Sequence, residues 1–196
     1  MKLVLATQNP KKLKEMNEIL SHLGVEVVSE AELGVRIEVE ETGETFTDNA
    51  RLKATAVMQA TGLPAVADDS GLMVDALNGE PGVYSARYGE GLDDKGRYTL
   101  LLEMLRGQTD RAAHFHTSIV CAFPNGDELV CEGECPGTIA FAPMGEGGFG
   151  YDPVFFVPEL RKTFGQLTAE EKASVSHRGK ALRAFASALD DYLKGN

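Results

Sequence analysis

The start of the chain alternates short apolar runs with one stretch of helical periodicity. Lys2 to Thr7 is aliphatic and leads into a turn signal, which predicts a buried strand. Asn9-Pro10 then places a capping residue before a proline at the first helical position. Apolar residues follow at helical spacing up to Gly24: Leu13, Met16, Ile19, Leu20 and Leu23. Because Val25 to Val28 predicts a second strand, the opening is typical of an α/β protein.

A second helix and another buried strand are predicted further along. Thr45 or Thr47 could cap a helix with one apolar stripe that ends at Gly62, formed by Phe46, Ala50, Ala54, Val57 and Met58. Pro64 to Ala67 is a short apolar strand that runs directly into Asp68-Asp69-Ser70-Gly71. We therefore expect these two aspartates at the carboxyl edge of the sheet.

The middle of the chain has an antiparallel pattern. Tyr98 to Leu105 is expected to be helical, and His114 to Phe123 reads as a strand. Asn125-Gly126 is a strong hairpin signal that leads into a second strand over Glu128 to Glu134. The predicted sheet is therefore mixed.

The last third combines a glycine-rich loop with helix start signals. Gly145 to Gly150 forms the loop, and Val154 to Val157 is apolar. Thr168-x-x-Glu171 matches a capping box, and Ser176 could cap a last helix with one apolar face: Leu182, Phe185, Leu189 and Tyr192. We expect an α/β fold over residues 1–196, a single domain with a mixed sheet, flanking helices and a cleft between two lobes.

Composition narrows the classes of partner and location. The chain has 196 residues and a formal charge of −11, which argues against a general nucleic-acid binder because such binding depends on Lys and Arg. The apolar start is too short for a signal peptide, and no continuous apolar run reaches the roughly 18 residues of a membrane span. Three cysteines make a disulfide framework improbable. These features predict a cytoplasmic protein.

Thr7 to Lys12 is the first candidate for chemistry. It joins the end of a strand to the start of a helix, where backbone N–H groups and the helix dipole attract anions. Lys11 and Lys12 add positive charge, although the segment lacks the Walker A pattern. The alternative is an ordinary turn with solvated lysines.

Two acidic clusters are the second candidate, Glu38/Glu40/Glu41 and Asp68-Asp69. Mg²⁺ commonly takes one or two carboxylates together with waters and substrate phosphates, and a carboxylate can deprotonate an attacking water. The alternatives are a solvated acidic loop over residues 38–44 and a capping or turn role for the two aspartates.

The third candidate lies near the carboxyl end and suits a nucleobase: Phe149, Gly150, Tyr151, Asp152, Lys172, Ser176, His177 and Arg178. Glycine admits close backbone approach, aromatic rings offer stacking faces and Arg offers a planar set of donors. Taken singly, the aromatics are more often core residues and His177-Arg178 a solvated helical turn. A zinc set of Cys131, Cys135 and two histidines lacks a second paired motif, and no serine-hydrolase elbow is present.

Six motifs occur together and in order along the chain: Thr7-Gln8-Asn9-x-x-Lys12, Glu40-Glu41-Thr42-Gly43, Ala67 to Leu72, Pro81 to Arg87, Gly148 to Pro153, and Ser176-His177-Arg178-Gly179. In this set the chain resembles the inosine triphosphate pyrophosphatase, or Ham1, family. The resemblance implies an elongated α/β fold, a homodimer, and Mg²⁺-dependent hydrolysis of ITP, dITP and XTP to the monophosphate and pyrophosphate.

The resemblance also implies a role for each matching residue. The triphosphate would be bound by Thr7, Gln8, Asn9, Pro10, Lys11, Lys12 and Lys53, the metal by Glu40 and Asp69, and the base by Phe149 to Asp152, Lys172, His177 and Arg178. Asp69 would also accept the proton of the attacking water, and Ser70 would contact the substrate. Gln8 departs from the glycine of many members. Two other readings stay open, a Maf-like pyrophosphatase that prefers other bases and a non-catalytic nucleotide sensor.

Overall fold

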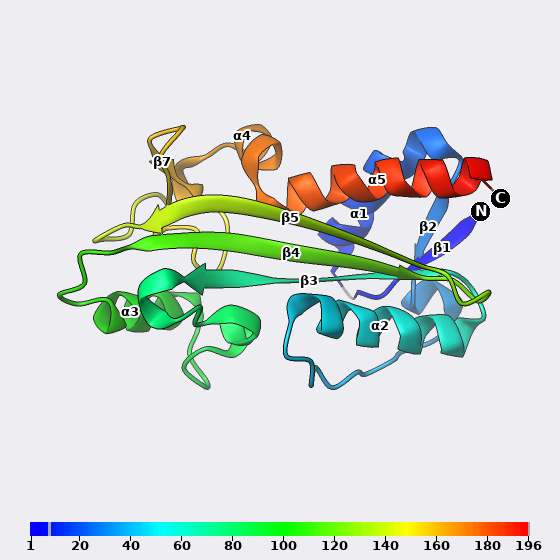
Figure 1. Ribbon diagram of the computed structural model, residues 1–196, viewed down its shortest axis with the longest axis horizontal. Coiled ribbons are helices and arrows are strands. Elements are labelled where there is room, and N and C mark those ends of the chain that lie inside the picture. Colours follow the sequence, from blue (N-terminus) through cyan, green and yellow to red (C-terminus); the bar gives the residue numbers. More distant parts are fainter. Residues whose placement is uncertain (8, 196) are drawn as a thin grey trace. The chain divides into compact units, whose positions relative to one another are not determined.

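The protein has an α/β fold built on one mixed sheet (Figure 1). The computed structural model describes residues 1–7 and 9–195, and over these residues the sheet has seven strands in the order β2-β1-β3-β4-β5-β6-β7. The strands are β1 (Lys2–Leu5), β2 (Glu26–Ser29), β3 (Ala65–Val74), β4 (Ala112–Ala122), β5 (Glu128–Ile139), β6 (Phe155–Val157) and β7 (Lys162–Thr163). The α-helices are α1 (Pro10–Leu20), α2 (Phe46–Thr61), α3 (Asp94–Met104), α4 (Ala169–Val175) and α5 (His177–Gly195).

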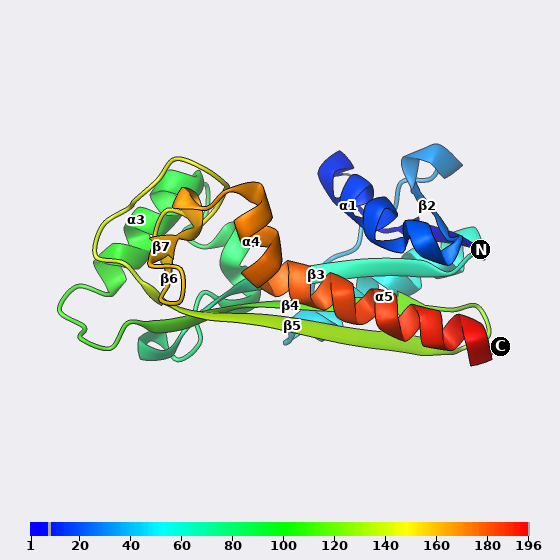
Figure 2. The same cartoon turned by 90° about the horizontal axis from the view of Figure 1, so that it is seen from above.

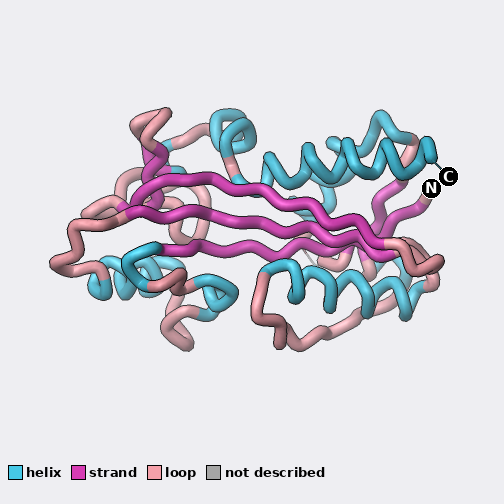
Figure 3. The backbone as a smooth tube through the Cα atoms, viewed as in Figure 1, coloured by secondary structure: helices cyan, strands magenta, loops and turns pink. Residues whose placement is uncertain are grey.

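Strand direction changes within the sheet. β1 pairs in parallel with β2 and with β3, whereas β5 pairs antiparallel with β6 and β6 with β7. The long strands β3, β4 and β5 alternate in direction (Figure 1) and form the longest magenta segments in Figure 3. The mixed sheet with flanking helices that the sequence predicts is confirmed.

The chain divides into two compact units, each made of separate segments. The first contains Met1–Asp69, Thr117–Gly133 and Lys180–Asn196, and the second contains Ser70–His116 and Glu134–Gly179. Three strands, β3, β4 and β5, contribute residues to both units. The single domain and the substrate cleft expected from the sequence stay predictions.

In the first unit, alternate residues of each strand face opposite layers of helices. Leu3 and Leu5 of β1 pack in a cluster with residues of α1 and α5, such as Met16 and Phe185. Val4, between those two leucines, instead packs in a cluster with Val57 of α2. This period of two follows from the pleat of a strand and gives the unit a helix layer on each face of the sheet, as Figure 1 shows.

The second unit has its own apolar core. Figure 2 shows α3, β6, β7 and α4 in this unit. Leu101 of α3 and Leu105, just after the helix, pack in one cluster with Leu72 of β3, Phe155 of β6 and Phe164. All five are fully or almost fully buried. The ring centroids of Phe155 and Phe164 lie 4.9 Å apart at an angle of 60°, an edge-to-face contact that aromatic pairs favour.

Several local signals in the sequence are confirmed. Asn9 caps α1 and accepts a hydrogen bond from the Lys11 N–H, with Pro10 as the first helical residue. Of the two threonines considered for α2, Thr45 is the cap. The Thr168–Glu171 capping box is present at α4, with both reciprocal hydrogen bonds. Each of these signals satisfies backbone N–H groups that the first turn of a helix leaves without partners.

The predicted position of Asp68 and Asp69 after a strand is wrong, because both lie inside β3. Apolar alternation resumes beyond them at Leu72 and Val74, which are fully buried, so the strand continues to residue 74. A turn or helix-capping role for the two aspartates is thereby excluded.

Within the residues described, no helix is both long enough and apolar enough to cross a membrane.

Candidate active site

The two adjacent aspartates lie just beyond the end of a neighbouring strand. β1 pairs with β3 only through Val4 with Ala65 and Leu5 with Val66, so Asp68 and Asp69 extend past the last residue of β1. The Asp68 side chain is 2% exposed and lies 2.7 Å from the Lys12 ammonium of α1. Asp68 is therefore a buried carboxylate whose charge is neutralised by the Lys12 ammonium.

Lys53 of α2 connects the second aspartate to the acidic loop. Its ammonium nitrogen lies 2.9 Å from a Glu41 oxygen and 3.1 Å from Oδ1 of Asp69. It also donates a hydrogen bond to the backbone oxygen of Asp68 at 3.0 Å. A lysine on a helix is ordinarily a solvated surface charge. Lys53 is not, because its side chain is only 20% exposed.

Burial and charge act in opposite directions on this group. Burial raises the pKa of the Asp69 carboxyl, Lys53 opposes the rise, and Glu41 adds to it. Burial alone would lower the pKa of Lys53, but Asp69 and Glu41 outweigh burial and leave that pKa raised. Lys53 therefore stays charged at neutral pH, next to two carboxylates.

Asn49 is a site residue that the sequence interpretation missed. It is fully buried, its amide nitrogen lies 3.4 Å from Oδ2 of Asp69, and its amide oxygen accepts a hydrogen bond from the Gly43 N–H at 2.8 Å. Asn49 thus connects the acidic loop to Asp69. Its spacing of four residues from Lys53 places both on one helix face, a signal that could have identified it.

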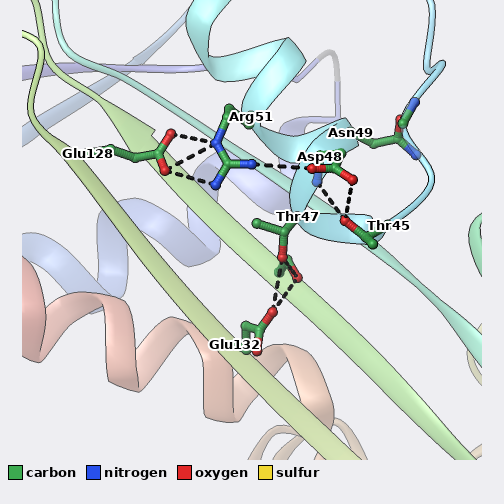
Figure 4. A network of polar contacts seen from close by, with 9 residues as sticks. Thr45, Thr47, Asp48, Asn49, Arg51, Glu128 and Glu132 are labelled. Atoms are coloured by element: carbon green, nitrogen blue, oxygen red, sulfur yellow. Dashed lines mark hydrogen bonds and ion pairs between the residues drawn. The ribbon is translucent and has the colours of Figure 1, made fainter.

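Contacts from β5 hold the same helix in place (Figure 4). The Arg51 guanidinium donates three hydrogen bonds to the Glu128 carboxylate, at 2.9, 3.0 and 3.2 Å, and the Thr47 hydroxyl donates to Glu132. Asp48, bonded to Arg51 and to the Thr45 cap, completes the network in the first turns of α2. The two-pronged Arg–carboxylate contact thus joins α2 to β5 two residues before Lys53.

A surface pocket of about 290 Å³ lies next to these residues within the first unit. Its lining comes from the end of β1, the segment before α2 and α2 itself: Ala6, Thr7, Glu30, Ile37, Glu38, Val39, Lys53 and Val57. Thr7 and Lys53, two residues expected to bind phosphate, therefore border one pocket.

Other described residues of the predicted phosphate loop lie at the start of α1 and just before it. The Thr7 hydroxyl accepts a hydrogen bond from the Asn9 N–H at 3.2 Å, and Pro10 and Lys11 open α1 with Lys11 exposed. Among the described loop residues, Lys12 contacts Asp68, and Thr7 lines the pocket that Lys53 also borders. Gln8 lies outside the described residues.

Alternating exposure separates the two glutamates of the acidic loop. From Val35 to Glu41 the odd-numbered residues are partly buried and the even-numbered ones exposed, as in an extended segment. Glu41 consequently lies on the inner side and reaches Lys53, whereas Glu40 is exposed to solvent. The structure thus brings Glu41, more directly than Glu40, into the group around Asp69.

In the second unit, another buried carboxylate–lysine pair lies beside an aromatic ring. Asp152 is 3% exposed and accepts hydrogen bonds from the Lys172 ammonium and, at 2.9 Å, from the Phe149 N–H. Burial raises the pKa of Asp152, and Lys172 opposes that rise. The Lys172 nitrogen also lies 4.7 Å from the centroid of the Phe149 ring, which is strongly exposed. These three predicted residues are brought together.

The Phe164 ring, which lies against both Lys172 and His177, connects His177 to this pair. The Tyr151 hydroxyl donates to the backbone oxygen of Ser85 at 2.8 Å, and the His177 ring stacks on Phe115 with centroids 4.7 Å apart. Arg178 is partly buried in the first turn of α5, and Ser70 is exposed on β3. His177 is therefore packed against an aromatic ring, not part of a solvated helical turn.

Comparison of the sequence and structure with known proteins identifies the family of this chain. The profile of the Ham1 family matches residues 3–188 of the chain. The chain belongs to the Ham1 family. A Ham1 relative from Thermus thermophilus named dITP/XTP pyrophosphatase is 54% identical over 194 residues, which cover 97% of this chain and 93% of that protein. A dITP/XTP pyrophosphatase from Yersinia pestis is 51% identical over 97% of this chain and 98% of its own length.

Solved structures agree with the Ham1 assignment. A HAM1 protein from Coxiella burnetii has a TM-score of 0.94 at 43% identity, covering 97% of this chain and 99% of its own. The Ham1 protein of Staphylococcus aureus has a TM-score of 0.90 at 42% identity, covering 100% and 99%. The family resemblance and the fold class expected from the sequence are both confirmed.

Proposed function

We propose that this Ham1 protein hydrolyses non-canonical purine nucleoside triphosphates, namely dITP, XTP and ITP, to the monophosphate and pyrophosphate. The observation that carries the proposal is the roughly half-identical sequence shared, over nearly the whole chain, with relatives named dITP/XTP pyrophosphatase. The lysine–carboxylate group around Asp69 supplies the kinds of side chain that this hydrolysis needs.

The first unit is proposed to bind the triphosphate. Lys12 and Lys53 would contact phosphate oxygens, and the start of α1 would add its free backbone N–H groups. The positions of Thr7 and Lys53 on one pocket support this assignment. Both lysines are paired with carboxylates, so bound phosphate would compete with Asp68 and Glu41 for their ammonium groups.

Asp69 is proposed to be the proton acceptor. A water held by its carboxylate would attack the α-phosphorus in line, its proton would pass to Asp69, and the bond from the α-phosphorus to the bridging oxygen would break to release pyrophosphate. Lys12 and Lys53 would stabilise the charge on the leaving group. The hydrogen bond from Asn49 and the ion pair with Lys53 hold the Asp69 carboxylate in position. No covalent intermediate is required.

A divalent cation, which we propose to be Mg²⁺, fits the charge of this group. Lys53 faces two carboxylates, Glu41 and Asp69. A third carboxylate, that of the exposed Glu40, directly precedes Glu41 in the sequence. Among the described residues no three His, Cys, Asp or Glu side chains gather to enclose a metal. A cation held by Glu40 and Asp69 would need further oxygen ligands, which waters and substrate phosphates provide. Once bound, it would offset negative charge on the leaving pyrophosphate.

The second unit is proposed to bind the purine through Phe149 to Asp152, Lys172, His177 and Arg178, with Ser70 as a further substrate contact. Hypoxanthine and xanthine carry a 6-oxo acceptor where adenine carries an amino donor. Donors such as the Arg178 guanidinium would pair with the oxo group and meet an unmatched donor in adenine. The exposed Phe149 ring offers a stacking surface, which supports this assignment.

The test is to identify the product released from dITP in the presence of Mg²⁺. Pyrophosphate and dIMP are expected, with ATP as a much poorer substrate. Orthophosphate would indicate a different phosphatase, preference for other bases would indicate a Maf-like enzyme, and binding without hydrolysis would indicate a nucleotide sensor. Each of these three results would overturn the proposal.

A cytoplasmic location and a homodimeric assembly complete the proposal. Both follow from the sequence interpretation and the family resemblance. Cell fractionation would test the first, and sedimentation velocity at several protein concentrations would test the second.

A further inference from the structure

α3 makes a hydrogen bond to the segment proposed to bind the purine. Oδ2 of Asp94, the first residue of α3, accepts a hydrogen bond from the Gly150 N–H at 2.7 Å, across 56 positions of sequence. Its other oxygen accepts from the Arg97 guanidinium at 2.6 Å. These two partners lower the pKa of Asp94, with the Gly150 contact as the larger cause. Asp94 is therefore charged at neutral pH while it holds Gly150.

The helix itself does not need this carboxylate as a cap. The preceding residue, Asp93, is the N-cap of α3 and accepts the Gly96 N–H at 2.7 Å. Capping and the long-range contact are thus divided between two adjacent aspartates. Asp94 can be altered without removing the cap.

The segment that Asp94 contacts has an unusual backbone. Gly148 and Gly150 have φ values of +80° and +60°, left-handed conformations that favour glycine, and they flank Phe149. Phe149 is 75% exposed, so burial does not fix its ring, which has the Lys172 ammonium 4.7 Å from its centroid. Its backbone is held instead, by the Phe149 N–H to Asp152 and by the Gly150 N–H to Asp94.

We infer that Asp94 is a positioning residue that orders the Phe149–Asp152 segment for the purine. The inference rests on the proposed function, because it takes this segment as the base-binding part. A hydrogen bond to a charged acceptor is stronger than a neutral one, and it fixes the turn before substrate arrives. Less backbone freedom then has to be lost on binding, which tightens binding of the base.

The kinetic test compares three variants, Asp94→Ala, Asp94→Asn and Asp93→Ala. Asp94→Ala is expected to raise KM for dITP by about tenfold with kcat changed less than about twofold, because removing an interaction that stabilises the ground and transition states equally affects KM. Asp94→Asn keeps an oxygen acceptor for the Gly150 N–H and should recover most of that loss. Asp93→Ala removes only the cap, so it should lower the melting temperature and leave KM unchanged.

Hydrogen exchange provides a readout that does not depend on activity. Peptides covering residues 147–152 should exchange faster in Asp94→Ala than in the wild type, and at the wild-type rate in Asp93→Ala. Unchanged exchange in Asp94→Ala, or a KM that follows helix stability across the variants, would overturn the inference. A wild type that releases no pyrophosphate from dITP would overturn the proposed function instead, and the exchange rates would still decide whether Asp94 orders this segment.

Discussion

Asp69 differs from Glu44, an acidic residue just before α2, in burial and in partners. Asp69 is held by Lys53 and Asn49 and is mostly buried, whereas Glu44, in the acidic loop before the helix, is exposed. Asp69→Asn should lower kcat for dITP by at least about a hundredfold, because loss of a general base typically costs that much. The measurement is pyrophosphate release under saturating substrate, with circular dichroism to confirm the fold.

Glu44→Gln is the matched control for that substitution. It removes an exposed carboxylate from the acidic loop and leaves the contacts of Lys53 and Asn49 with Asp69 in place, so the rate should stay near that of the wild type. Near-normal turnover in Asp69→Asn would remove Asp69 from the mechanism.

Arg178 and Arg183 allow a similar comparison for base selectivity. Both lie on α5, but Arg178 is partly buried in the first turn and Arg183 is exposed. Arg178→Ala should reduce the ratio of kcat/KM for dITP to that for dATP by about tenfold, because the substitution removes a donor to the 6-oxo group. Arg183→Ala should leave the ratio unchanged. Equal ratios in Arg178→Ala and wild type would assign discrimination to other groups.

At the scale of elements, the acidic loop depends on its close approach to α2. A Cβ added to Gly43 would lie 2.6 Å from Cβ of Asp48 and 2.7 Å from Oδ1 of Asn49. Gly43→Ala must therefore displace the loop that carries Glu40 and Glu41, or shift Asn49 away from Asp69. We expect a loss in kcat/KM of about tenfold or more, since small displacements of catalytic groups are costly.

Thr45→Ala is the control for this change. It removes the cap of α2 and should lower the free energy of unfolding by about 1 kcal/mol, with little effect on kcat/KM. Denaturant unfolding and initial rates would be measured on both variants. If Gly43→Ala and Thr45→Ala each lose activity only in proportion to their loss of unfolding free energy, the close approach of Gly43 to α2 has no specific role in catalysis.

Local elements were the part of the fold that could be predicted. Caps such as Asn9 and Thr168 act on N–H groups two or three residues away, so a short window of sequence contains the whole interaction. The Asn125-Gly126 hairpin is equally local, and the Gly126 N–H does donate to Phe123. Candidate residues with strong chemistry, such as Lys12 and Asp152, were also identifiable from residue type and motif.

Long-range partners could not be predicted, because they depend on how elements pack. The choice of Glu41 as the inner glutamate depends on the phase of an extended loop. The extension of β3 beyond Ala67 did have a local signal in Leu72 and Val74, but two adjacent aspartates interrupt the apolar pattern. The hydrogen bond from the Gly150 N–H to Asp94 joins a loop to a helix with no sequence signal between them. Such interactions require the three-dimensional structure.

For the molecule as a whole, acidity makes the proposed metal requirement testable. The formal charge is −11, and in the first unit Lys12 and Lys53 are already paired with carboxylates. A triphosphate adds several negative charges, so binding it without a cation would be unfavourable. Chelation should abolish pyrophosphate release, and added Mg²⁺ should restore it. Full activity in excess chelator would contradict the metal proposal.

The interleaved segments of the two units have a consequence for truncation. Residues 1–69 include β1 and β2 and enter β3, but the β4 and β5 residues of the same unit arrive only at Thr117–Gly133. An isolated amino-terminal fragment would expose β3 as an unpaired sheet edge, a hazard for aggregation. Neither unit can be produced by cutting the gene at one point. Binding studies on either half therefore require the intact polypeptide with substitutions confined to that half.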